Sequence, residues 1–109
     1  MPTWVLLAMA IAAEITATTS IKLSDGFTKL APIAIIIAGY LASFFLLSKV
    51  LARGWSLGVV YAVWSAFGIA LIALIDAFWF GHRFTPVQIA GLAMITAGVV
   101  ALELGGVAT

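Results

Sequence analysis

The sequence predicts an all-α membrane protein with four transmembrane helices, and three observations lead to that fold class. Hydrophobic residues make up 65% of the 109 residues, whereas charged residues make up only 8%. A water-soluble domain of this size exposes a large share of its surface and cannot bury so much apolar area. The apolar runs are about 20 residues long, which suits helices that cross a hydrocarbon core of about 30 Å. These runs also lack the alternation that is typical of a membrane β-barrel.

We expect the whole chain, residues 1–109, to form one transmembrane domain with short connections between its helices. The turn pair Asp25–Gly26 separates the first two spans, and Pro32 opens the second span, where a missing N–H costs least. The four expected spans cover about residues 4–21, 32–51, 57–80 and 87–104.

The loop charges are nearly balanced across the membrane. Lys49 and Arg53 fall on one side of a four-span chain, and Lys22, Lys29 and Arg83 fall on the other. Positively charged loops favour the cytoplasmic side, so this balance gives only a weak bias and lets the chain insert either way round. Two inverted copies could then form an antiparallel homodimer.

Glu14 is a carboxylate near the middle of the first expected span, roughly 15 Å from its start at about 1.5 Å per residue. An ionisable residue at such a depth is costly to insert and usually faces a bundle interior or an aqueous cavity. Small neighbours such as Ala10 and Ala17 leave space beside the carboxylate, and Thr18 could donate a hydrogen bond to it. We therefore expect Glu14 to be the functional centre, able to exchange a proton for another cation. The alternative is a structural carboxylate bonded to a neighbouring helix.

Aromatic residues on two other spans could line a cavity that faces this carboxylate. Tyr61 and Trp64 are three residues apart in the third span, and Tyr40, Phe44 and Leu47 recur at helical spacing in the second. Aromatic rings beside a carboxylate suit a lipophilic cation, because ring faces attract positive charge. The alternative is that these residues only pack between helices or anchor the chain at the membrane interface.

Small residues follow one stripe of the fourth span. Gly91, Gly98 and Gly105 recur at seven-residue intervals. Stripes of this kind let helix backbones approach closely and associate in lipid. We expect this helix to form an interface with a second chain, since four spans can hardly enclose a substrate path alone.

Several classes of function are disfavoured by composition. The absence of cysteine rules out disulfides and thiolate metal sites, and a net charge of +1 offers no footprint for nucleic acid. The sequence has no metal-ligand cluster, no nucleophile triad and no phosphate-binding glycine loop, so we expect neither an enzyme nor a cofactor.

We expect Asp76 and Glu103, near the ends of their spans, to pair with basic residues, and His82 to be a solvated loop residue.

The motifs AEITATTSIKLSDGFTKL, YAVWSAFG and GLAMITAGV together resemble the small multidrug resistance family, over the whole chain. The resemblance implies an antiparallel dimer in the bacterial plasma membrane that exchanges protons for cationic hydrophobic compounds by alternating access. Glu14 matches the position at which that family binds both protons and substrate, and Gly91 and Gly98 match its dimerisation motif. By the same resemblance the pocket would contain Trp4, Ala10, Ile11, Thr18, Tyr40, Phe44, Leu47, Tyr61 and Trp64.

Several positions within the resemblance bear on substrate and partner. Guanidinium exporters of the family carry tryptophan two residues after the glutamate, and Thr16 stands there instead, which resembles the quaternary-ammonium and multidrug branch. The third span reads Ala66–Phe67–Gly68 where the family has a glycine-rich kink. Asp76 and Glu103 occupy positions that are usually uncharged, so pairing with a paralogue is an alternative to a homodimer. A guanidinium exporter, a headgroup flippase and a non-transporting membrane scaffold are the other functional alternatives.

Overall fold

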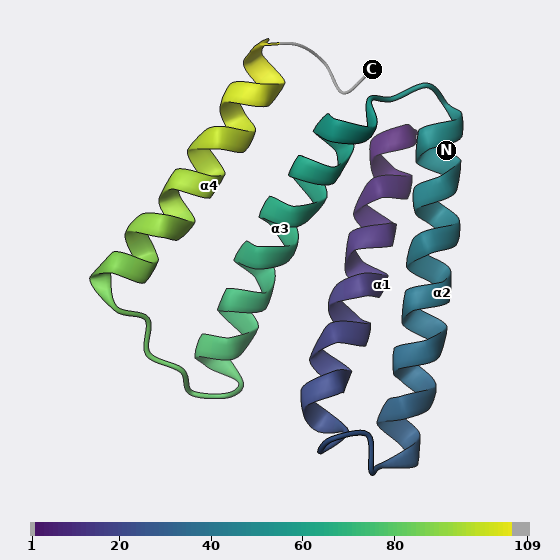
Figure 1. Ribbon diagram of the computed structural model, residues 1–109, viewed down its shortest axis with the longest axis vertical. Coiled ribbons are helices and arrows are strands. Elements are labelled where there is room, and N and C mark those ends of the chain that lie inside the picture. The colour runs from purple at the N-terminus through teal and green to yellow at the C-terminus, as the bar shows by residue number, and fades with distance from the viewer. Residues whose placement is uncertain (1, 106–109) are drawn as a thin grey trace. The chain divides into compact units, whose positions relative to one another are not determined.

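The computed structural model describes residues 2–105, which form four α-helices and no strand (Figure 1). Each helix is long and apolar enough to cross a membrane, which confirms the expected all-α class. The chain divides into two compact units, one up to Gly54 and the other from Trp55. That the four helices form one domain stays a prediction. The helices are α1 (Thr3–Leu23), α2 (Leu30–Ala52), α3 (Leu57–Phe78) and α4 (Pro86–Gly105).

Most helix ends differ from the expected ones by one or two residues, and two of these differences have local reasons. The second helix begins at Leu30 and so includes Pro32 in its first turn, where backbone N–H groups have no helical acceptor to lose. The third helix ends at Phe78 instead of residue 80. Gly81 soon afterwards adopts a φ of 73°, which lies outside the helical region.

The first unit is an antiparallel pair in which α1 and α2 lie side by side (Figure 1). Their close approach centres on Gly39 of α2, where a Cβ atom would lie 2.8 Å from the Cβ of Ala17 and 2.9 Å from the carbonyl oxygen of Ala13. Small residues on both helices therefore allow the backbones to approach each other closely. The buried residues of α2 recur at intervals of seven and are Ile36, Ser43 and Val50.

A left-handed turn joins α1 to α2. Asp25, Gly26 and Phe27 all have positive φ angles, of 50°, 70° and 65°. This conformation is unfavourable for a residue with a Cβ atom. The buried Ser24 braces the turn, because its hydroxyl accepts from the backbone N–H of Phe27 at 3.0 Å and donates to the carbonyl of Ile21 at 2.7 Å.

In the second unit, side chains cap the start of both helices. The hydroxyl of Ser56 accepts from the backbone N–H of Val59 at the start of α3. At the start of α4, the Thr85 hydroxyl accepts from the Gln88 N–H at 3.2 Å, and the Gln88 side chain accepts from the Thr85 N–H at 3.0 Å. This reciprocal capping box is a strong helix start signal.

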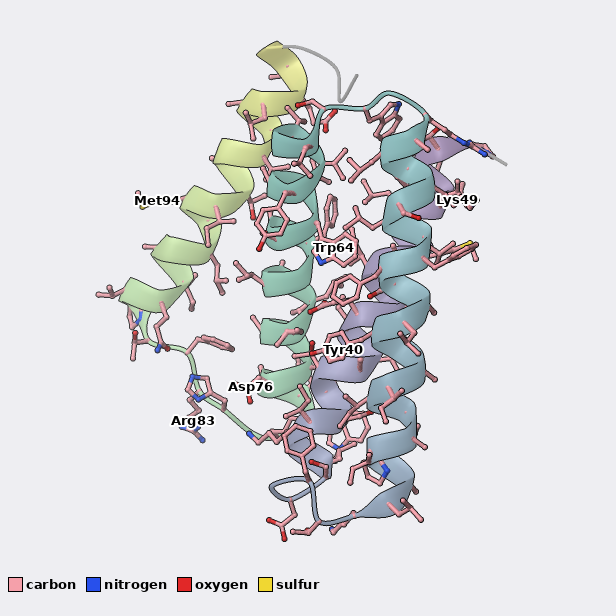
Figure 2. All side chains as sticks on the ribbon, turned by 45° about the vertical axis from the view of Figure 1, so that its right-hand side comes forward. Tyr40, Lys49, Trp64, Asp76, Arg83 and Met94 are labelled. Atoms are coloured by element: carbon pink, nitrogen blue, oxygen red, sulfur yellow. The ribbon has the colours of Figure 1, made fainter. Side chains whose placement is uncertain are left out.

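No described residue of α4 is buried, and Met94 points away from α3 (Figure 2).

Candidate functional site

Glu14 lies just past the middle of α1, about 17 Å along the helix from Thr3 at about 1.5 Å per residue. The hydroxyl of Thr18, one turn further on, donates a hydrogen bond of 2.9 Å to Glu14 Oε1. This is the contact that the spacing of four residues predicted. The carboxylate therefore has a polar partner within its own helix, in a segment that is otherwise mostly apolar.

The same Thr18 hydroxyl connects Glu14 to the second helix. Tyr40, near the middle of α2 (Figure 2), has its hydroxyl 2.8 Å from Thr18 Oγ1. The Tyr40 ring in turn stacks on Phe44, with centroids 6.1 Å apart and an angle of 15° between the planes. The structure thus brings together a carboxylate, two hydroxyls and two aromatic rings, all within the first unit.

Gly39 and Ala17 set the spacing on which this connection depends. They precede Tyr40 and Thr18 by one residue each, so the close backbone contact is adjacent to the hydrogen bond between the helices. A larger residue at either position would push the helices apart at the level of the two hydroxyls. Next along α2, the buried Ser43 donates from its hydroxyl to the Tyr40 carbonyl at 2.9 Å.

The remaining predicted pocket residues of the first unit spread along both helices. Ala10 and Ile11 are buried residues of α1, in the turn before Glu14. Leu47 follows Phe44 on α2 and is half-buried. Trp4 lies in the first turn of α1 and is 65% exposed. It is about 15 Å from Glu14 along the helix axis, at about 1.5 Å per residue, so it is not part of the hydrogen-bonded cluster.

The predicted residues of the second unit lie on α3 and α4. Tyr61 and Trp64 are one turn apart on α3, and the Tyr61 ring is 65% exposed. The helix is continuous through Ala66–Phe67–Gly68. On α4, a Cβ atom added at Gly91 or Gly98 would meet no atom within 4 Å, so both glycines border open space.

Sequence reasoning missed Gly39 and Ser43 as parts of the site. A signal for them exists, because two small residues four apart on α2, Gly39 and Ser43, have a counterpart in Ala13 and Ala17 on α1. Such pairs are typical of closely packed membrane helices. The spacing alone could not show which two helices would meet through them.

The cluster can hold a proton or a positive charge at Glu14. An ionised carboxylate only accepts hydrogen bonds, whereas a protonated one can also donate. Aromatic faces add attraction for an organic cation. Residues 2–105 contain no group of three His, Asp or Glu side chains that could hold a metal ion.

Comparison with known proteins gives consistent matches over nearly the whole chain. Residues 2–95 match the family described as Small Multidrug Resistance protein. The chain is 42% identical over 104 residues to a multidrug transporter of Pseudomonas aeruginosa, which covers 95% of this chain and 94% of the relative. It is 43% identical over 101 residues to the quaternary ammonium compound-resistance protein QacE of Escherichia coli, covering 93% and 91%. It is 43% identical over 104 residues to the multidrug resistance protein mmr of Mycolicibacterium paratuberculosis, covering 95% and 97%.

These matches agree with four helices that can each cross a bilayer. They identify a multi-pass protein of the bacterial plasma membrane that is a multidrug transporter and not an enzyme. The resemblance seen in its glutamate, aromatic and glycine motifs is confirmed. The chain therefore belongs to the small multidrug resistance family.

Proposed function

We propose that this transporter exports lipophilic and quaternary ammonium cations in exchange for protons, and that Glu14 binds either the proton or the cation. The observation that supports this proposal best is the cluster around Glu14. A carboxylate near the middle of α1 accepts from Thr18, and Thr18 connects it to Tyr40, whose ring stacks on Phe44. Within the described part of the first unit, this cluster joins an acid to aromatic faces inside an apolar span.

The cation class follows from this chemistry and from the relatives. A carboxylate supplies charge, and rings supply an apolar contact that also attracts positive charge, so a bulky organic cation gains from both. One relative is named as a quaternary ammonium compound-resistance protein. Thr16 stands where guanidinium exporters have tryptophan, which favours the lipophilic cation over guanidinium.

Exchange results if proton and cation exclude each other at Glu14. A bound cation favours the ionised carboxylate, so cation binding releases a proton, and a fall in pH weakens cation binding. A carrier that changes its open side only with one or the other bound would move them in opposite directions. The inward proton gradient then drives the cation out.

The transporting unit in this proposal is two inverted copies of the chain. The nearly balanced loop charges allow both orientations. The α4 helix has no buried residue among those described, and Gly91 and Gly98 leave room for the close approach of a second helix. Each copy would contribute one Glu14, and two like charges in one site would bind their protons as a coupled pair.

Uptake into proteoliposomes tests the exchange directly. We expect wild-type vesicles with an acidic interior to accumulate a quaternary ammonium dye, and Glu14→Gln vesicles to accumulate none. The matched control is Glu103→Gln, which removes the exposed acid in the last turn of α4 and should leave dye uptake intact. Proton-driven uptake and pH-dependent dye binding that persist in Glu14→Gln would overturn the proposal.

A further inference from the structure

The hydroxyl of Thr18 is used differently from those of its neighbours on α1. Thr16 and Ser20 each donate to a backbone carbonyl four residues earlier, at 2.9 Å and 2.8 Å, as hydroxyls in helices commonly do. Thr18 instead donates to the Glu14 side chain and also lies within hydrogen-bond distance of Tyr40. It is therefore the middle member of a chain of three polar side chains that crosses from α1 to α2.

The ionised state of Glu14 fixes the direction of this chain. A hydroxyl carries one hydrogen, and a carboxylate can only accept. When the Thr18 hydrogen points to Glu14 Oε1, the 2.8 Å contact can only be a bond that Tyr40 donates to Thr18. The Tyr40 hydrogen is then directed at Thr18, and the remaining lone pairs of the Tyr40 oxygen face away from Thr18.

A proton on Glu14 Oε1 allows the opposite direction. The protonated carboxyl donates to Thr18, and the Thr18 hydrogen turns towards Tyr40, whose oxygen becomes the acceptor. The Tyr40 hydrogen is then free to point away from Thr18. A cation beside the Tyr40 hydroxyl is attracted by lone pairs that face away from Thr18 and is repelled by an O–H group that points the same way. One proton on Glu14 therefore changes the charge at one end of the chain and the hydroxyl direction at the other.

We propose that Thr18 is a positioning residue that reverses this hydrogen-bond chain when Glu14 gains a proton, so that Tyr40 favours a cation only while Glu14 is charged. The inference rests on the proposed function, because it assumes that Glu14 exchanges protons with cations. It adds that the charge of Glu14 sets the direction of the hydrogen bond between Thr18 and Tyr40 of α2. The Gly39 contact keeps the two helices close enough for this.

Other charged groups on these two helices lie away from the chain of hydroxyls. On α1, Lys22 is eight residues from Glu14, or about 12 Å along the axis at about 1.5 Å per residue. On α2, Lys49 is nine residues from Tyr40, about 14 Å along the axis, and its ammonium lies over the Phe45 ring. Lys29 and Arg53 flank the ends of α2. Among the titratable groups of α2, Tyr40 is thus the one that Thr18 connects to Glu14.

Nuclear magnetic resonance of the tyrosine Cζ atom, the ring carbon that carries the hydroxyl, can test the reversal of the hydrogen-bond chain. The chain has two tyrosines, so Tyr61→Phe leaves Tyr40 as the single reporter in the full-length protein in lipid bicelles. In this background we expect the Tyr40 signal to shift with pH at the midpoint of the Glu14 carboxyl signal. Thr18→Ser keeps the hydroxyl and should keep the shift, whereas Thr18→Val replaces it with a methyl group and should abolish it. A Tyr40 signal that ignores Glu14, or one that still follows it in Thr18→Val, overturns the inference.

Binding of tetraphenylphosphonium separates this inference from the proposed function. The measured quantity is the ratio of its Kd at low pH to its Kd at high pH. We expect Thr18→Val to reduce this ratio about threefold relative to Thr18→Ser, as the loss of one hydrogen bond allows. Equal ratios in the two variants, with a wild-type Kd that still depends on pH, would refute the reversal of the hydrogen-bond chain. The proposed exchange at Glu14 would then still hold. A wild-type Kd that does not change with pH would refute both.

Discussion

Gly39 of α2 lies so close to Ala17 of α1 that a Cβ atom on the glycine would be 2.8 Å from the alanine Cβ. The next residue on each helix, Tyr40 and Thr18, forms the hydrogen bond that links the helices. Backbone proximity and the polar connection are thus adjacent in both sequences. The position of Tyr40 relative to Glu14 depends on a residue that has no side chain.

Gly39→Ala is therefore expected to destabilise the first unit. The new methyl group would also meet the carbonyl oxygen of Ala13 at 2.9 Å, and backbone atoms cannot move aside as a flexible side chain can. Overpacking of this kind typically costs about 1–3 kcal/mol, measurable as a lower free energy of unfolding in mixed micelles titrated with dodecyl sulfate. In Gly58→Ala, the control, the added Cβ meets its nearest atom at 4.0 Å. Equal stability of the two variants would contradict the close contact.

Phe44→Leu should weaken cation binding. Phe44 stacks on Tyr40 and presents an aromatic face close to the Glu14 cluster. A cation–π contact is worth about 0.5–1 kcal/mol at exposed sites, so we expect Kd for tetraphenylphosphonium to rise about two- to fivefold. The neighbouring Phe45→Leu removes an equally exposed ring, 61% against 59%, that contacts Lys49 instead. If both substitutions change Kd equally, the effect is not specific to the cluster.

Thr85→Ala should loosen the start of α4. The substitution removes the hydroxyl that accepts from the Gln88 N–H, and losing such a cap costs about 1 kcal/mol. Amide hydrogen exchange in the first turn of α4 should accelerate about fivefold. Thr96→Ala removes a hydroxyl that donates to the Leu92 carbonyl, inside the same helix, and should leave that turn unchanged. Unaltered exchange in Thr85→Ala would contradict the capping role.

Lysines added to one loop should separate the two membrane orientations. Extra lysines beside Arg53 draw the loop between α2 and α3 to the cytoplasm, and lysines beside Arg83 draw the loop between α3 and α4 there. If transport needs inverted copies, each variant alone should fail to confer resistance to a quaternary ammonium compound. Co-expression of the two should restore it, and glutamine insertions of the same length serve as controls. Full resistance from one variant fixed in one orientation would argue against the inverted dimer.

The fold class could be predicted from the sequence, and so could the candidate functional residue, Glu14. Apolar runs of about 20 residues specify spanning helices because lipid offers backbone groups no other partners. Glu14 was conspicuous because an acid at that depth is costly. Its bond with Thr18 was also predictable, since residues four apart share one helix face.

Packing between helices determines which residue of another helix completes the cluster. The sequence predicts Tyr40 as one of several aromatic candidates on two spans, and only the packing of α1 against α2 brings its hydroxyl to 2.8 Å from Thr18 Oγ1. Gly39 and Ser43 went unnoticed because their effect arises from how near a second backbone comes, and no spacing within one helix encodes that distance. The depth of Glu14 in an apolar run and the spacing of four residues therefore predict the carboxylate and its bond with Thr18, whereas contact between helices decides that Thr18 connects it to Tyr40.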